Sequence, residues 1–296
     1  MARFNEETLN SWRKPPSDTE DSKLSNSLRL VKDAISKHDW LSTLNLDIFG
    51  QGSYANDTNV RLNSDIDVCV MNRDCFFYDI PKNAYAGDYG LGTPCGYLFL
   101  EYKNQIEKAL KDCFGRESVV RGNKCITVKG NTYRIETDVV AAWEYRNYGE
   151  QGGYVAGTKL ISDASDAVLN YPKQHIFNAI QKNHLTHKRF KRLTRILKKI
   201  RYRMIADGFS VDDGITSFLL ESLLWNVPDN VFIINNTWSD RLKEAIVFLY
   251  NKTTDPATCK EWGEVSELLY LFHNQRKWTI QSVNKFMQDL WTYLEF

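Results

Sequence analysis

Apolar positions in the first half of the chain follow a helical period and then a strand period. An amphipathic helix is predicted over 17–38, because four apolar residues recur there at intervals of three and four: Leu24, Leu28, Val31 and Ile35. A second helix is predicted over 97–114. Short β-prone runs predict strands at 45–49, 65–71, 124–129 and 132–142, with a turn at Gly130-Asn131 between the last two. The glycines of 149–158 predict a loop.

The pattern changes near residue 172, after which helices dominate. We predict helices at 173–183, 186–206, 213–226, 238–251 and 280–294, and assign nothing to 252–279. Asp212 or Asp213 can cap the third of these helices, and Pro228 can end it. We therefore expect an α+β fold. A mixed sheet flanked by helices would occupy residues 1–171, a helical lobe would occupy 172–296, and the N-terminal helix would pack along both.

Composition places the chain among globular proteins. It has 296 residues, of which 43% are hydrophobic and 25% charged, and this length favours about two domains. No apolar run approaches the roughly 18 residues of a membrane span, and the first residues lack the apolar segment of a signal peptide. None of the six cysteines belongs to a C-x-x-C or zinc-finger pattern. We expect a cytoplasmic protein with reduced, mostly buried thiols.

Two carboxylates lie two residues apart in a predicted strand. Asp65 and Asp67 would therefore point to the same side of a sheet. A divalent cation would offset their repulsion, and oxygen ligands favour Mg²⁺ or Mn²⁺. Asp138, in a later apolar strand, is the expected third ligand, with Glu136 as its alternative. Three carboxylates can hold two metal ions, the arrangement that serves in-line phosphoryl transfer.

A Gly-Ser pair precedes these carboxylates. Gly52 lets the backbone approach a phosphate, the Ser53 hydroxyl and the N–H groups of a following helix can bind its charge, and Gln51 can reach a phosphate or ribose. A lone D-x-D is more often a solvated strand end, and a lone Gly-Ser pair is weaker still. Together with the later strand aspartate, they predict a metal-dependent nucleotide site.

Basic residues are concentrated in one stretch. The chain has 38 Lys and Arg against 37 Asp and Glu, yet residues 167–206 hold eleven basic residues and no acidic one. These charges can bind a triphosphate, line a groove for RNA or DNA, or form a solvated face, which is the usual outcome. We expect most to be solvated and one or two to bind phosphate. A stripe of Phe190, Leu193, Leu197, Ile200 and Met204 is expected to be buried, with a neighbouring stripe of Lys191, Arg195 and Lys198.

Ser217 and Phe218 are the last feature that the pattern leaves open. By periodicity alone, Phe218 is a core residue of the predicted helix. The alternative is that Ser217 binds phosphate and Phe218 stacks on a base.

Five stretches together resemble one family, the bacterial cGAS/DncV-like nucleotidyltransferases (CD-NTases) of the polymerase-β-like superfamily. They are GQGSYANDTNV, NSDIDVCV, IETDVVAAW, NYPKQHIFNAIQKNHLTHKRFKRLTRILKKIR and ITSFLLESLLWNVPD. The resemblance covers roughly residues 17–230. It implies a polymerase-β-like core, with a helical lobe that completes the nucleotide pocket. It also implies catalytic metal ligands at Asp65, Asp67 and Asp138, and nucleotide contacts at Gln51, Gly52, Ser53, Lys182, Asn183, Lys198, Ser217 and Phe218, with Asn178 near the base pocket.

The implied activity is Mg²⁺-dependent, with two ions and Mn²⁺ as a substitute. ATP and other nucleoside triphosphates would be joined into a cyclic di- or trinucleotide with release of pyrophosphate, and the diffusible product would reach a downstream effector in CBASS anti-phage signalling. We expect a monomer without membrane association or direct nucleic-acid binding. The zinc insertion of animal cyclic GMP-AMP synthase is missing, and the C-terminal WTYLEF does not suit conjugation.

Two other functions stay open from the sequence. The first is another enzyme of the superfamily, such as a linear oligonucleotide synthase or an RNA-tailing nucleotidyltransferase. The second is a catalytically silent nucleic-acid-binding module, for which three mutually repelling acids have no evident use.

Overall fold

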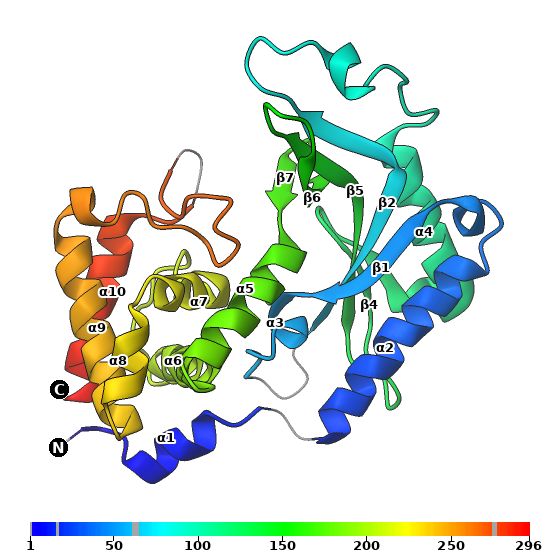
Figure 1. Ribbon diagram of the computed structural model, residues 1–296. Helices are drawn as coiled ribbons and strands as arrows, with labels where there is room; N and C mark the ends of the chain where they lie inside the picture. The colour runs from blue at the N-terminus through cyan, green and yellow to red at the C-terminus, as the bar shows by residue number, and fades with distance from the viewer. Residues whose placement is uncertain (1, 16–17, 61–64, 274–276) are drawn as a thin grey trace. The chain divides into compact units, whose positions relative to one another are not determined.

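The computed structural model describes residues 2–15, 18–60, 65–273 and 277–296, and the chain divides into two compact units (Figure 1). The helical unit comprises Met1–Pro16, Asn56–Val60 and Gln174–Phe296, and the sheet unit comprises Ser17–Ala55 and Arg61–Lys173. This division differs from the predicted one, 1–171 and 172–296, mainly at the N-terminus and at 56–60. Both of these segments belong with the helical unit.

Within the described residues, seven strands form one mixed sheet in the order β1-β2-β5-β4-β3, with β6 paired to β5 and β7 paired to β6. Strands β2 and β5 are parallel, and the other pairs are antiparallel. The strands are β1 (Leu46–Gln51), β2 (Ile66–Asp79), β3 (Val119–Arg121), β4 (Ile126–Val128), β5 (Thr137–Tyr148), β6 (Tyr154–Ile161) and β7 (Ala167–Asn170).

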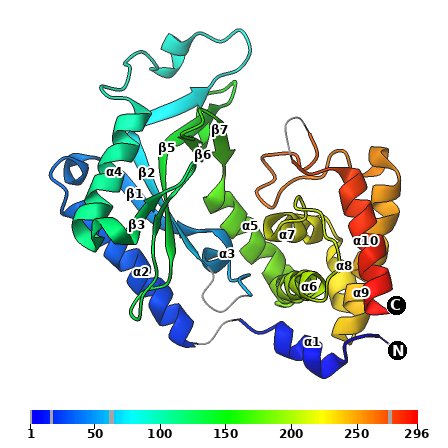
Figure 2. The ribbon, with the colours of Figure 1, turned by 180° about the vertical axis from the view of Figure 1, so that it is seen from behind.

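Helices α2 (Asp18–Ser36) and α4 (Phe99–Phe114) cover one face of this sheet, as Figures 1 and 2 show from opposite sides. Apolar side chains of both helices pack on Ile66 and Val68 of β2, and all are buried. Because neighbouring strand residues point to opposite faces, Asp67 faces away from this core. The prediction that the residues flanking Asp67 hold the strand in place is confirmed.

Most predicted elements of the sheet unit are confirmed, and β2 is longer than predicted. The tight turn at Gly130-Asn131 was wrong, because β4 ends at Val128 and β5 begins only at Thr137. The loop over 149–158 was also wrong in part, since β6 begins at Tyr154. Position 157 in this strand is occupied by glycine, because a Cβ there would lie 2.8 Å from the Tyr171 ring.

A disulfide joins Cys75 to Cys95, with Cα atoms 5.3 Å apart. The prediction of reduced thiols was therefore wrong for this pair. The two cysteines are 20 residues apart, outside any recognisable motif, and they meet because the loop after β2 returns toward the strand before α4 begins. Cys69 and Cys259 are free and buried, as expected, whereas Cys113 is exposed.

The helical unit has a single large apolar core. Its helices are α1 (Glu6–Trp12), α6 (Arg189–Ala206), α7 (Ser217–Trp225), α8 (Asp229–Ile234), α9 (Trp238–Thr254) and α10 (Ile280–Leu294), together with most of α5 (Pro172–Leu185). The predicted apolar stripe of α6 is confirmed, since every residue from Phe190 to Met204 in that stripe is buried. None of the described helices is both long enough and apolar enough to cross a bilayer.

Three details of the helical predictions need correction. Helix α7 begins at Ser217 and is capped by the Thr216 side chain, which accepts from Leu219 N, so neither Asp212 nor Asp213 caps it. The N-terminal segment forms two helices, α1 in the helical unit and α2 in the sheet unit, in place of one helix packed along both. Of the described residues in 252–279, the first complete α9, Pro256–Thr258 form a short 3-10 helix, and most of the rest form turns and bends, with an isolated bridge between Gly263 and Tyr270.

Candidate functional site

Four polar residues form one row across the sheet. Gln51 on β1 lies opposite Asp67 on β2, Asp67 lies beside Asp138 on β5, and Asp138 lies opposite Thr127 on β4. Residues in register on neighbouring strands point to the same face. The two aspartates predicted from widely separated motifs are therefore adjacent, on the face of β2 turned away from the α2–α4 core.

The carboxylates of this row affect one another strongly. Burial, then the charges of Asp138 and Asp65, raise the pKa of Asp67 to about 7. Asp65 lies just before β2 and is exposed. These residues therefore form a concentration of negative charge that a bound cation would relieve.

The third carboxylate has a fixed orientation. The Thr127 hydroxyl donates to Asp138 Oδ1 at 2.6 Å. The Cys125 thiol also interacts with Asp138. Burial, and then the charge of Asp138, raise the pKa of this thiol to about 11. Sequence reasoning missed both neighbours, since an isolated Thr or Cys in a short strand gives no signal. The alternative ligand, Glu136, is exposed and lies outside β5.

The predicted phosphate-binding turn adjoins this row. Helix α3 (Gly52–Ala55) follows β1 directly, as predicted for the residues after the Gly-Ser pair. Gly52 has a φ of +70°, and a Cβ there would be only 2.1 Å from Asp67 Oδ2. The turn and the carboxylate thus pack so closely that only glycine fits. Asn63 and Ser64, which precede Asp65 in the motif, lie outside the described residues.

The chemistry of this site suits a hard divalent cation. All of its charged ligand candidates are carboxylates, and their repulsion would be relieved by a metal ion. Among the residues that the structure describes, no three His, Cys, Asp or Glu side chains already form a closed metal site. Since Mg²⁺ usually takes one or two carboxylates together with water and substrate phosphates, an open arrangement fits this ion.

The helical unit holds the remaining predicted residues. Ser217 begins α7, and its Oγ lies 3.1 Å from the hydroxyl of Tyr202 on α6. Phe218 is neither buried nor isolated: 36% of it is exposed, and its ring stacks on Trp278 with centroids 5.5 Å apart. His175 lies on Phe218 with a centroid distance of 5.6 Å. An exposed, supported aromatic ring favours the stacking role over the core role.

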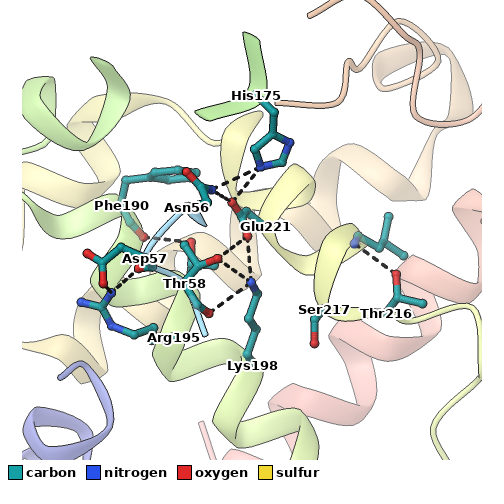
Figure 3. Close-up of polar contacts among 12 residues, drawn as sticks. Asn56, Asp57, Thr58, His175, Phe190, Arg195, Lys198, Thr216, Ser217 and Glu221 are labelled. Atoms are coloured by element: carbon teal, nitrogen blue, oxygen red, sulfur yellow. Dashed lines mark hydrogen bonds and ion pairs between the residues drawn. The ribbon is translucent and has the colours of Figure 1, made fainter. Parts of the chain in front are cut away.

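The two lysines predicted to contact nucleotide are buried. Lys198 is only 2% exposed and pairs with Glu221 at 2.7 Å, as Figure 3 shows. Lys182 is also buried and donates to the Val227 carbonyl and to Asp229, each at 2.8 Å. In this structure both lysines therefore have protein partners, and a triphosphate contact for either stays a prediction.

Two asparagines of the predicted base-pocket region also have protein partners. The Asn183 side-chain oxygen Oδ1 accepts from the backbone N–H of Lys191 at 3.2 Å, across the break between α5 and α6. Asn178 donates to the Val265 carbonyl at 2.8 Å. Nucleotide contacts from these residues likewise stay predictions. Lys191 and Arg195 are buried with Lys198, so this stripe is not the solvated face expected of a charge run.

Comparison with known proteins extends the resemblance. The model of the cGAS/DncV-like nucleotidyltransferase C-terminal helical domain matches residues 177–295. The chain is 56% identical to the cyclic dipyrimidine nucleotide synthase CdnE of Cecembia lonarensis over 100% of both chains. It is 36% identical to the cyclic dipurine nucleotide synthase of Elizabethkingia meningoseptica over 99% of each.

A solved structure has the same fold. The Rhodothermus marinus CdnE c-UMP-AMP synthase, determined with Apcpp and Upnpp, has a TM-score of 0.85 and 28% identity to this chain. The similarity covers 98% of this chain and 97% of that one. Because the matches reach the last helices, they include the region past residue 235 in which no motif is recognisable.

Proposed function

The chain belongs to the cGAS/DncV-like nucleotidyltransferase family, and from this premise we propose that it joins two pyrimidine nucleoside triphosphates into a cyclic dinucleotide with release of pyrophosphate. The observation that carries the proposal is the packing of Gly52 against Asp67, beside Asp138 in the neighbouring strand. This arrangement combines a phosphate-binding turn with carboxylates suited to a metal ion.

Asp65, Asp67 and Asp138 would hold the metal, which we propose to be two Mg²⁺ ions or Mn²⁺ in their place. When bound, the ions neutralise the triphosphate and lower the pKa of the attacking hydroxyl. Asp138, oriented by the Thr127 hydroxyl, would accept the hydroxyl proton. The Ser53 hydroxyl and the backbone of the turn, with Gln51 beside it, would orient the phosphates.

Residues of the helical unit would bind the rest of the nucleotide. Ser217 would contact phosphate from the N-terminus of α7, where backbone N–H groups favour an anion. Phe218, supported by Trp278 and His175, would stack on a base. A second nucleotidyl transfer in the same site, within the linear intermediate and with release of a second pyrophosphate, would close the ring.

The choice of bases is proposed from similarity alone. The relative at 56% identity is named for a dipyrimidine product, whereas the one at 36% is named for a dipurine product. The higher identity over the full length favours pyrimidines. We propose that the enzyme acts in the cytoplasm, where nucleoside triphosphates are available. It would act as a monomer, and its diffusible product would reach the effector.

Pyrophosphate release tests the site directly. Purified protein with UTP, CTP and Mg²⁺ is expected to release pyrophosphate, and Asp67→Asn should lose at least about 1,000-fold in rate, since metal stabilisation of the transition state is worth several kcal/mol. Asp47→Asn, which removes a carboxylate paired with Lys173 from the neighbouring strand β1, is the matched control and should keep its activity.

The same assay separates the alternatives. Wild-type rates in Asp67→Asn contradict the site. A product that loses its terminal phosphates to phosphatase indicates a linear oligonucleotide synthase or a tailing enzyme. No release by the wild type, together with tight, salt-dependent RNA binding, indicates a silent binding module.

A further inference from the structure

Glu221 is the centre of a buried polar cluster in the helical unit. It lies on α7 one helical turn after Ser217, and only 3% of it is exposed. Its Oε2 accepts from Lys198 Nζ at 2.7 Å and from the Thr58 hydroxyl at 2.7 Å. Its Oε1 accepts from the Asn56 amide and lies 3.0 Å from His175 Nε2. Figure 3 shows all four partners converging on this carboxylate.

The four partners come from separate parts of the chain. His175 is on α5 and Lys198 on α6, whereas Asn56 and Thr58 lie in the segment that follows α3. Because a carboxylate can only accept hydrogen bonds, His175 must carry its proton on Nε2 to donate to Oε1. One side chain on α7 therefore joins two other helices to the chain directly after the Gly52–Ala55 turn.

The segment Asn56–Thr58 is held at every residue. Asn56 and Thr58 are almost completely buried. Asp57, with a φ of +52°, is in the left-handed region, and both its carbonyl and its carboxylate accept from Arg195. A polar segment in this conformation is costly unless all of its groups are bonded. Arg195 and Lys198 of α6 and Glu221 of α7 supply most of those bonds, while the buried Asn56 Oδ1 has no partner among the described residues.

Glu221 is also connected to the residues expected to contact nucleotide. His175, which donates to Glu221, places its ring against Phe218. On the same face of α7, Ser217 lies against Tyr202, one turn along α6 from Lys198. The Lys198–Glu221 and Tyr202–Ser217 contacts thus form two successive links between α6 and α7.

The charge of Glu221 depends on its partners. Burial alone would raise its pKa, but the Lys198 charge and the hydrogen bonds from His175 and Lys198 outweigh burial and hold the pKa below its usual range. Removing one member of a buried ion pair leaves an uncompensated charge, whereas replacing both by neutral groups is often tolerated.

We propose that Glu221 is a positioning residue that fixes α7, His175 and the Asn56–Thr58 segment so that Ser217 and Phe218 can engage the nucleotide. The proposal rests on the proposed function. It assigns to Lys198 the balancing of the Glu221 charge. Glu221 and Lys198 then act through the residues they hold.

Three variants test this assignment. Glu221→Gln keeps the shape and one acceptor but leaves the Lys198 charge unpaired, and Lys198→Met leaves the Glu221 charge unpaired. The double variant Lys198→Met/Glu221→Gln removes both charges of the pair. Its new amide oxygen can accept from Asn56, and its amide N–H can donate to the Thr58 hydroxyl oxygen. The melting temperature is measured for each, and kcat and KM for UTP are measured at a temperature where every variant is folded.

Positioning predicts that each single variant loses on the order of 100-fold in kcat/KM while still folded, because small displacements of reacting groups are costly. It also predicts that the double variant recovers at least about tenfold over Lys198→Met, together with its melting temperature, since the two sites are coupled.

A matched control separates positioning from stability. Lys103 is another buried lysine, paired with Asp163 at 2.8 Å in the sheet unit. Lys103→Met should lower the melting temperature while leaving kcat/KM of the folded enzyme unchanged. If Glu221→Gln behaves in the same way, its role is stability alone and the positioning proposal is overturned.

Two further outcomes also overturn the proposal. If the double variant regains its melting temperature but keeps the raised KM of Lys198→Met, Lys198 contacts the triphosphate directly. If the double variant regains neither activity nor stability, the charge pair is not what holds the cluster. A wild-type protein without pyrophosphate release would instead contradict the proposed function, so the two failures are distinguishable.

Discussion

Gly52 is the residue at which the predicted phosphate-binding turn meets the predicted metal-binding carboxylate of Asp67. Its backbone has a φ of +70°, and the space where a Cβ would lie is taken by Asp67 Oδ2. The turn predicted to bind phosphate and the carboxylate predicted to bind metal are therefore in close contact. A glycine is required here for two reasons, the backbone conformation and the lack of room.

We expect Gly52→Ala to lower kcat/KM by about 100-fold or more, because the added methyl group must displace the Asp67 carboxylate. Stability should also fall, since alanine is strained at this φ. Gly90→Ala is the control. Gly90 has a nearly identical φ of +68° but no atom within 4 Å of its Cβ position. Equal activity losses in both variants would show that backbone strain, and not the contact with Asp67, is responsible.

Residues that carry a charge in a recognisable pattern were predictable. Asp65, Asp67 and Asp138 follow from alternation and apolar context, and the sheet register places the last two side by side. Glu221 was not predictable, because a single acid in an apolar helix resembles a surface position. Only the fold brings four donors to it. Sequence reasoning therefore identifies the groups expected to react more easily than it identifies the groups that position them.

At the scale of elements, periodicity predicts long helices and buried strands well. Helix α10 has the predicted bounds, 280–294. The errors occur where tertiary contacts override local pattern. Gly157 lies within a strand, where its lack of a side chain makes room for the Tyr171 ring. Helix α7 is capped by Thr216, the residue directly before it, and not by the aspartates farther ahead in the chain. The Cys75–Cys95 disulfide likewise depends on a loop path that spacing does not reveal.

One ion-pair cluster joins α4, β3 and the chain after β6, and it gives a pH-dependent prediction. Hydrogen bonds from Arg121, then those from Lys103, hold the pKa of Asp163 well below its usual range. A depressed folded-state pKa stabilises the protein above the unfolded pKa of about 3.9, and this contribution is lost as the pH falls toward the folded value.

Asp163→Asn is therefore expected to lower the melting temperature at pH 7, and the difference from wild type should shrink as the pH falls below about 4. Calorimetry from pH 7 to pH 3 measures the effect. Asp112→Asn, on the exposed face of α4, should change little at any pH. A difference between Asp163→Asn and wild type that stays constant with pH would show that the charge of Asp163 is not what stabilises the cluster.

At the scale of the whole molecule, the even balance of 38 basic and 37 acidic residues hides a segregation of charge. The acids predicted to bind metal belong to the sheet unit, and the basic stretch, except for 167–173, belongs to the helical unit. Four of the eleven basic residues in that stretch are buried: Lys182, Lys191, Arg195 and Lys198. Their charge is used within the protein and adds little to a nucleic-acid surface.

Nucleic-acid binding should accordingly be weak. We expect duplex DNA and RNA to bind at physiological salt no more tightly than the non-specific range, with a Kd above about 10⁻⁶ M, when measured by fluorescence anisotropy. Binding in the nanomolar range with a steep dependence on salt would contradict this expectation and favour a nucleic-acid ligand for the basic stretch.

The central claim is that this chain synthesises a cyclic dipyrimidine nucleotide at the Asp65–Asp67–Asp138 site. The most direct measurement is mass spectrometry of the products formed from all four nucleoside triphosphates with Mg²⁺, after treatment with phosphatase. The account predicts a phosphatase-resistant cyclic dinucleotide made of pyrimidines, which is absent when Asp65→Asn and Asp67→Asn are combined. Only linear or phosphatase-sensitive products, or an unchanged product from the double variant, would contradict it.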